Sequence, residues 1–204
     1  MVLSVRCDVT NPEEIEAALL AGIQFFGGID ILVSNAGNFP ESQNIEAMDD
    51  SNWEKSLELN LSSHMRIMRA SLPFLKEGFD PAVVIVASKN VPAPGPGAAA
   101  YSSAKAGLTQ MARVAALELG ADGIRVNALH PNAVYDTALW TDEVLASRAE
   151  NYGMSVEEYK TSNVLKTEVS SKDVARAVAL FAGNLLDKTT GSQLPIDGGN
   201  ERVI

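Results

Sequence analysis

The sequence predicts an α/β fold, a doubly wound parallel sheet with helices on both faces in a three-layer sandwich. Two observations predict it. Segments with strand patterns alternate with segments of helical periodicity along the chain. Residues 82–87 are almost uninterrupted Val and Ile, as in a strand that is covered on both faces. Because alternating elements cross over between parallel strands, the sheet is expected to be parallel.

The individual elements follow from their residue patterns. Residues 2–9 form a candidate strand rich in β-branched side chains. A helix is expected from there to about Phe26, because Thr10 can cap it and Pro12 suits its first turn. Further strands are predicted at residues 29–34, 82–87, 124–129 and 193–196, and further helices at residues 53–75, 98–119, 141–163 and 171–181.

Composition excludes several function classes. The net charge of -10 over 204 residues argues against a nucleic-acid partner or an anionic membrane surface. No apolar run reaches the roughly 20 residues of a membrane span. One cysteine, Cys7, fits a reducing compartment, which predicts a cytoplasmic protein. With only two histidines besides, no metal site is expected.

Polar or Gly-bearing segments follow the predicted strands. Ligands of such sheets bind beyond the carboxyl ends of the strands. Four features fall there, namely Asp8, the Asn35-Ala36-Gly37 loop, Ser88 and residues 131–137. The sequence therefore predicts a site at that edge of the sheet.

Tyr101 and Lys105 lie one turn apart at the start of the helix after Ser88. Lowering the pKa of a tyrosine from ~10 to ~7 takes about 4 kcal/mol, which one ammonium at ~4 Å supplies at an effective dielectric constant of ~20. Ser88 would hydrogen-bond the reacting oxygen. This trio can do general acid–base chemistry on an alcohol or carbonyl, with the hydride left to a cofactor. The Tyr-x-x-x-Lys spacing alone more often marks only a helix surface.

These residues together resemble the short-chain dehydrogenase/reductase family. Ser88 precedes Tyr101 by thirteen positions, the usual spacing of that family, and Asn60 matches its fourth catalytic residue. The resemblance implies a Rossmann-like domain over residues 1–204, with Asn60, Ser88, Tyr101 and Lys105 as catalytic residues. Asn60 has a second interpretation, a polar group that bonds the backbone across a helix kink.

The resemblance also implies a dinucleotide cofactor, NAD or NADP, with NAD favoured. Ser34-Asn35-Ala36-Gly37 is similar to the family's Asn-Asn-Ala-Gly signature, with Ser for the first Asn. Asp8 matches a residue that contacts the adenine, although it is also an ordinary residue ahead of a helix. Asn132 replaces the usual Gly, and Thr137 comes one residue late. The implied cofactor-binding residues are Asp8, Asn35, Ala36, Gly37, Tyr101, Lys105, Pro131, Val134 and Thr137.

Later segments resemble a narrower group, the dehydrogenase half of bifunctional aldolase/short-chain dehydrogenases. They include residues 130–140, 148–153 and 188–200. This group implies oxidation of a small sugar-derived alcohol or aldehyde with NAD. Residues 136–164 are expected to form a lid, whose Trp140, Tyr152 and Tyr159 are expected as core rather than as pocket lining.

The family's first strand, Gly-rich turn and helix have no counterpart here, so the domain is expected to be partial and N-terminally truncated. A misassigned start, a fragment and a genuine short form are the three explanations. The missing strands would lie between residues 2–9 and 29–34, so the first elements dock differently or another chain covers the exposed edges. Weak or no NAD(P) binding is expected.

Two function classes therefore remain. One is an NAD(P)-dependent oxidoreductase of a small alcohol or carbonyl, and the other is a catalytically idle domain that persists as an oligomer. The helices at residues 53–75 and 98–119 match the family's dimer-forming pair, so a homodimer or homotetramer is expected in either case. Halide-eliminating relatives are disfavoured, because they carry Arg at the position of Lys105.

Overall fold

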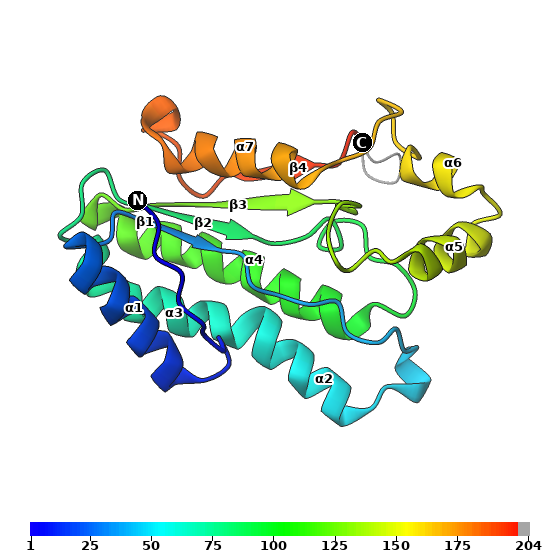
Figure 1. Cartoon of the computed structure of the whole chain (residues 1–204), viewed down its shortest axis with the longest axis horizontal. Helices are drawn as coiled ribbons and strands as arrows, with labels where there is room; N and C mark the ends of the chain where they lie inside the picture. Colours follow the sequence, from blue (N-terminus) through cyan, green and yellow to red (C-terminus); the bar gives the residue numbers. More distant parts are fainter. Residues whose placement is uncertain (200–204) are drawn as a thin grey trace.

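A computed structural model describes residues 1–199 and confirms the predicted α/β architecture (Figure 1). Within these residues, one parallel sheet has the strand order β1-β2-β3-β4. Val84 in the central part of the sheet lies beside Val33 on one side and Asn127 on the other. The strands are β1 (Ile31–Ser34), β2 (Ala82–Val86), β3 (Arg125–Pro131) and β4 (Gln193–Ile196).

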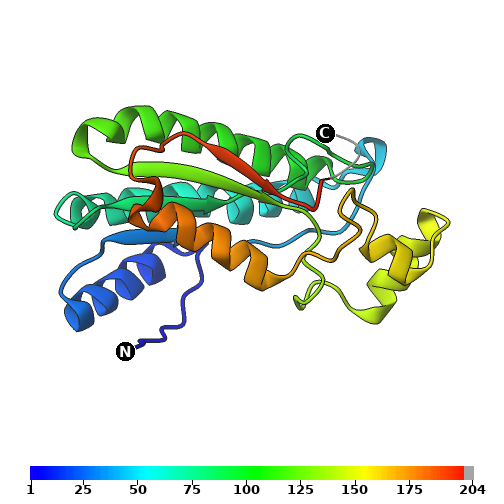
Figure 2. The same cartoon turned by 90° about the horizontal axis from the view of Figure 1, so that it is seen from above.

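Helices cover both faces of this sheet, as Figures 1 and 2 show. Helices α3 and α4 pack on one face of the sheet, and α7 packs on the other. Helix α1 packs against α3. No helix in residues 1–199 is long and apolar enough to cross a membrane. The helices are α1 (Pro12–Phe26), α2 (Asp50–Leu57), α3 (Ser63–Leu75), α4 (Ala99–Leu119), α5 (Asp142–Asn151), α6 (Val156–Lys160) and α7 (Ser171–Ala182).

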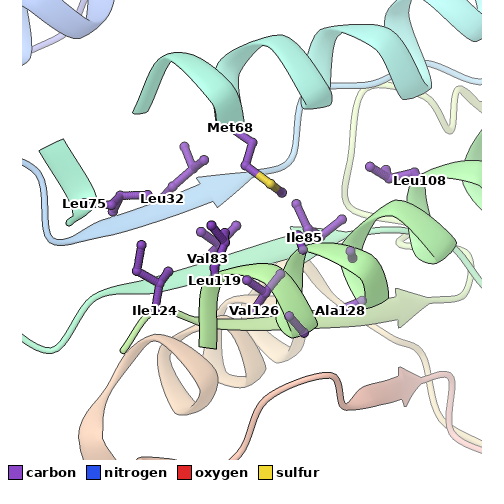
Figure 3. Packing of buried hydrophobic residues seen from close by; sticks show 13 residues of the cluster. Leu32, Met68, Leu75, Val83, Ile85, Leu108, Leu119, Ile124, Val126 and Ala128 are labelled. Atoms are coloured by element: carbon purple, nitrogen blue, oxygen red, sulfur yellow. The ribbon is translucent and has the colours of Figure 1, made fainter. Parts of the chain in front are cut away.

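Strand β2 contributes to the core on both sides of the sheet, because its side chains alternate between two buried faces. Val83 and Ile85 join the cluster under α3 and α4, where Figure 3 shows Val83 beside Leu119. Val84 joins the second cluster, with Phe181 of α7. This two-sided burial explains the continuous Val/Ile run of the sequence, and each buried side chain of this size stabilises the fold by about 1.5–3 kcal/mol.

The N-terminal prediction was wrong in two respects. Residues 2–9 form no strand, since no other described strand lies beside them and an isolated strand is not stable in water. The cap of α1 is Asn11 rather than Thr10. The Asn11 side chain accepts hydrogen bonds from the backbone N–H groups of Glu13 and Glu14, at 2.9 and 3.4 Å.

Two predicted helices are divided. The helix expected at residues 53–75 begins at Asp50, and a π-helical turn at Glu58–Ser62 separates α2 from α3. The helix expected at residues 141–163 is interrupted at Gly153, whose φ of 64° is left-handed and favours glycine. A capping box formed by Ser155 and Glu158 then starts α6.

Strand β1 lies at an edge of the sheet in the part of the chain that the structure describes. Its Leu32 and Ser34 face the core under α3, whereas Ile31 and Val33 are 44% and 43% exposed. The sheet is therefore only partly covered beside β1 on the face that α7 packs against.

Candidate active site

The strands point with their carboxyl ends toward α5 and α6, the helices of the segment expected to form a lid, as Figure 1 shows. The segments that follow β1, β2 and β3 therefore meet at this end of the molecule. They are the Asn35–Gly37 loop, Ser88 and the turn after Pro131. Tyr101 and Lys105 come to the same end from the first turns of α4, so the structure brings the predicted trio together.

Lys105 is buried, and its ammonium donates a 3.1 Å hydrogen bond to the backbone carbonyl of Val86 at the end of β2. The same ammonium lies 5.9 Å from the centroid of the Tyr101 ring. Burial disfavours the charged form and lowers the pKa of Lys105 to about 8. The cation is thus held within reach of the phenol without touching it.

The Tyr101 phenol behaves differently from the sequence-based expectation. Burial raises its pKa, and a hydrogen bond with Ser88 opposes that shift. The expected lowering of the Tyr101 pKa is not found in this arrangement, because desolvation of the phenolate outweighs the hydrogen bond with Ser88. Ser88 is itself held in place, since its Oγ accepts the Asn90 N–H at 3.1 Å and its carbonyl lies 2.9 Å from His130 Nδ1.

Asn60 lies in the π-helical turn between α2 and α3 and is buried. Its side-chain amide donates to the carbonyl of Asn38 at 2.9 Å and accepts the Asn38 N–H at 3.1 Å. The amide therefore bonds the backbone of the loop after β1, whereas the second interpretation expected a bond to the backbone across the helix kink. π-helical turns inside α-helices are frequent at functional sites, so this geometry is compatible with the catalytic interpretation as well.

Gly37 joins the signature loop to the catalytic groups. A Cβ atom at this position would lie 2.8 Å from Asn60 Oδ1 and 3.4 Å from Lys105 Nζ. The loop itself is exposed, so its backbone can be approached closely from solvent. Gly37 thus brings this loop directly beside Asn60 and Lys105.

Sequence reasoning missed a buried pair under this loop. Ser34 Oγ lies 2.7 Å from His64 Nδ1, and His64 Nε2 makes no hydrogen bond in residues 1–199. Burial, followed by the nearby charge of Lys105, lowers the pKa of His64 to about 4. The position of His64 one helical turn after Asn60 is a signal that could have indicated it.

The remaining predicted residues lie in two places. Thr137 closes a turn by donating from its hydroxyl to the Val134 carbonyl at 2.8 Å, just after Pro131 ends β3. Asp8 lies apart, exposed ahead of α1, where its carboxylate accepts hydrogen bonds from Thr10 and its pKa is lowered by them. No contact joins Asp8 to the trio among the described residues.

The lid aromatics pack against one another rather than in the sheet core. The Tyr159 ring contacts the rings of Tyr135, Trp140 and Tyr152, and Tyr152 is exposed. No group of three His, Cys, Asp or Glu side chains that could hold a metal ion occurs in residues 1–199.

Comparison with known proteins shows which protein family this chain resembles. Residues 1–201 match the family model described as enoyl-(acyl carrier protein) reductase. An uncharacterized oxidoreductase of Bacillus subtilis, YuxG, is 34% identical over 97% of this chain, which spans 29% of that relative. A short chain dehydrogenase/reductase of Aspergillus oryzae, astE, is 30% identical over 97% of this chain, which spans 74% of it.

Solved structures give the same picture. Carveol dehydrogenase from Mycobacterium avium, in complex with NAD, matches 98% of this chain with a TM-score of 0.90 and 25% identity, over 75% of its own length. A 3-ketoacyl-(acyl-carrier-protein) reductase from Brucella melitensis, complexed with NADH, matches 99% with a TM-score of 0.85 and 28% identity, over 78% of its length.

Proposed function

Because the chain belongs to the short-chain dehydrogenase/reductase family, we propose that it is built for NAD(P)-dependent oxidation or reduction of a small alcohol or carbonyl. The observation that carries this proposal is the convergence of four groups at the carboxyl edge of the sheet. Tyr101 and Ser88 share a hydrogen bond, Lys105 lies one helical turn from the phenol, and Asn60 lies across Gly37 from Lys105.

Each group has a role that its position supports. Tyr101 gives or takes the proton of the substrate oxygen, and Ser88 holds that oxygen beside the phenol. Lys105 supplies a cation whose lowered pKa of about 8 lets it exchange protons near neutrality. Asn60 holds the Asn38 backbone, and the neighbouring Gly37 leaves room for both the Asn60 amide and the Lys105 ammonium.

The cofactor residues suit the nicotinamide end of a dinucleotide, which supplies or accepts the hydride when bound. The exposed Asn35–Gly37 loop lies beside the Lys105 ammonium, and the Val134–Thr137 turn follows β3 at the same edge. NAD is favoured over NADP, and Asp8 is assigned to the adenine side. A Gly-rich phosphate-binding turn is not found after any described strand, so we expect weak dinucleotide binding by this 204-residue chain.

The substrate is proposed to be a small alcohol or carbonyl, with a sugar-derived one favoured. Relatives named for such reactions include D-beta-hydroxybutyrate dehydrogenase of Rhizobium meliloti. The chain spans only 29% of the Bacillus relative, which fits the proposed kinship with one half of a bifunctional protein. The single free cysteine, Cys7, fits action in the cytoplasm.

The proposal is tested with the 204-residue chain, NAD or NADH at high concentration, and a panel of alcohols and aldehydes. Tyr101→Phe is expected to lower kcat about 100-fold or more, since it removes the proton donor. Ser103→Ala on the exposed side of the same helix is the matched control. Equal turnover by wild type and Tyr101→Phe would contradict the assignment, and a micromolar dissociation constant for NADH would contradict weak binding.

An alternative function is a catalytically idle domain that persists as an oligomer. The exposed apolar side chains Val114 and Leu117 on the outer face of α4 favour this reading. A version of the chain extended upstream separates the two functions. If neither the 204-residue chain nor the extended version turns over any substrate, and both are oligomeric, the idle-domain function is correct.

A further inference from the structure

Arg148 of the lid helix α5 reaches the catalytic tyrosine through one aromatic ring. Its guanidinium carbon lies 5.8 Å from the centroid of the Phe39 ring, and that ring lies 4.8 Å from the centroid of the Tyr101 ring. Arg148 also donates a 3.3 Å hydrogen bond to Ser42 Oγ. Residues from the lid, from the loop after β1 and from α4 thus converge on one point beside the trio.

This guanidinium lacks an acidic partner in residues 1–199. Its neighbours one turn away on α5, Val144 and Leu145 before it and Asn151 and Tyr152 after it, carry no charge. No ion pair of Arg148 occurs with any described carboxylate, in a chain where acidic residues outnumber basic ones, 26 to 16. This half-buried guanidinium has no described carboxylate to compensate its charge, which points to an external anion as its partner.

The other cations of the site are already engaged. Lys89 forms a buried ion pair with Asp197, and Lys105 bonds the Val86 carbonyl. Both therefore have partners inside the protein. Arg148 is the cation that remains available to a substrate at the lid side of the described site.

We propose that Arg148 binds a carboxylate or phosphate group of the substrate, at the end remote from the reacting carbon. The proposal rests on the proposed function, because it assigns the substrate class of the same site. A planar guanidinium offers paired donors that match either anion, and its stacking on Phe39 fixes their direction. No direct contact joins Arg148 to Tyr101 in residues 1–199, so the anion lies away from the carbon that exchanges the hydride.

The test compares anionic substrates with neutral partners of the same skeleton, namely hydroxybutyrate with butanediol and a sugar phosphate with the unphosphorylated sugar. Arg148→Gln is expected to lower kcat/KM about 10- to 100-fold for the anionic member of a pair, mainly by raising KM, and to leave the neutral member unchanged. Arg148→Lys is expected to recover part of the loss. An effect of Arg148→Gln on the hydroxybutyrate pair indicates a carboxylate site, and an effect on the sugar phosphate pair indicates a phosphate site.

The matched control is Arg113→Gln, which removes one positive charge from the exposed side of α4. It is expected to change neither member of a pair. An equal effect of Arg148→Gln on anionic and neutral substrates, or no effect on either, overturns the inference.

Binding without turnover separates this inference from the proposed function. Saturation-transfer NMR detects hydroxybutyrate and a sugar phosphate on the full 204-residue chain whether or not it reacts. Binding that Arg148→Gln abolishes, together with no turnover of any substrate, supports the anion site while the proposed function fails. Equal NMR signals for wild type and Arg148→Gln overturn the anion site, and turnover of butanediol then leaves the proposed function standing.

Discussion

A single glycine determines how close the signature loop comes to Asn60 and Lys105, two of the proposed catalytic residues. Gly37 leaves room for the side chains of Asn60 and Lys105, which pack where a Cβ atom would be. Both are buried polar groups, and each needs the hydrogen bond that it makes here. At the residue scale, the site therefore depends on a missing side chain as much as on those that are present.

Gly37→Ala is expected to destabilise the protein by about 1–3 kcal/mol, since the added carbon would lie 2.8 Å from Asn60 Oδ1 and must displace it. Urea unfolding measures the loss, and activity is expected to fall with it. Gly22→Ala is the matched control, because nothing lies within 4 Å of its Cβ position in the interior of α1. It is expected to stabilise by about 0.5–1 kcal/mol. The same sign for both variants would contradict the role of Gly37.

His64 makes stability depend on pH in a defined range. Its pKa is lowered from 6.5 to about 4 by burial, so the unfolded chain binds its proton at a higher pH than the folded protein does. Burial of neutral His64 therefore causes no pH-dependent change in the free energy of unfolding above pH 6.5. As the pH falls from 6.5 toward 4, the free energy of unfolding decreases by about 3 kcal/mol in total. Urea unfolding from pH 7 to pH 4.5 is expected to show this decline.

The control for this prediction is His64→Gln, in which the decline between pH 6.5 and pH 4.5 is expected to be smaller. NMR gives an independent readout, because the chain has only two histidines. A His64 ring signal that titrates near pH 6.5 in the folded protein would contradict the buried neutral state.

At the scale of elements, the two faces of α4 have different environments. Its inner face carries Leu108 into the core and Lys105 into the site, which lies near the helix N-terminus. Its outer face exposes Leu117, 84% of which is open to solvent. A large apolar side chain that is this exposed beside Val114 favours contact with another copy of the helix.

Leu117→Glu is expected to dissociate the proposed dimer or tetramer, because it places a charge in the centre of the apolar patch on α4. Size-exclusion chromatography with light scattering measures the change. Leu185→Glu is the matched control, since this leucine is 79% exposed elsewhere on the molecule. An unchanged mass for Leu117→Glu would show that α4 is not the contact.

At the scale of the whole molecule, a buried ion pair joins the loop after β2 to the segment after β4. Lys89 and Asp197 are 108 residues apart in the chain, and both are buried where their strands end. Lys89 follows Ser88 directly, so the C-terminal part of the fold supports the catalytic loop. The pair compensates two charges that would each be costly alone.

Asp197→Asn is expected to cost about 3–5 kcal/mol, because it leaves the Lys89 ammonium buried without its counter-charge. The double variant Lys89→Met, Asp197→Leu is expected to regain most of that loss, since no charge then remains buried. Urea unfolding of the three proteins checks this. A double variant that is less stable than Asp197→Asn would contradict the explanation.

The sequence by itself determined the features that depend on local pattern and motif. Residue alternation predicted the α/β class, the Val/Ile run predicted the two-sided strand β2, and the spacing of Ser88, Tyr101 and Lys105 predicted their convergence at one edge. These predictions succeeded because burial and helical periodicity act over a few residues.

Only the tertiary structure decided the rest, because it depends on what lies beside each residue. Residues 2–9 have a strand pattern but no neighbouring strand in the described chain, so they form none. Burial reverses the expected shift in the pKa of Tyr101 and keeps His64 neutral. The contact of Arg148 with Phe39 joins positions that are 109 residues apart, and no local pattern encodes it.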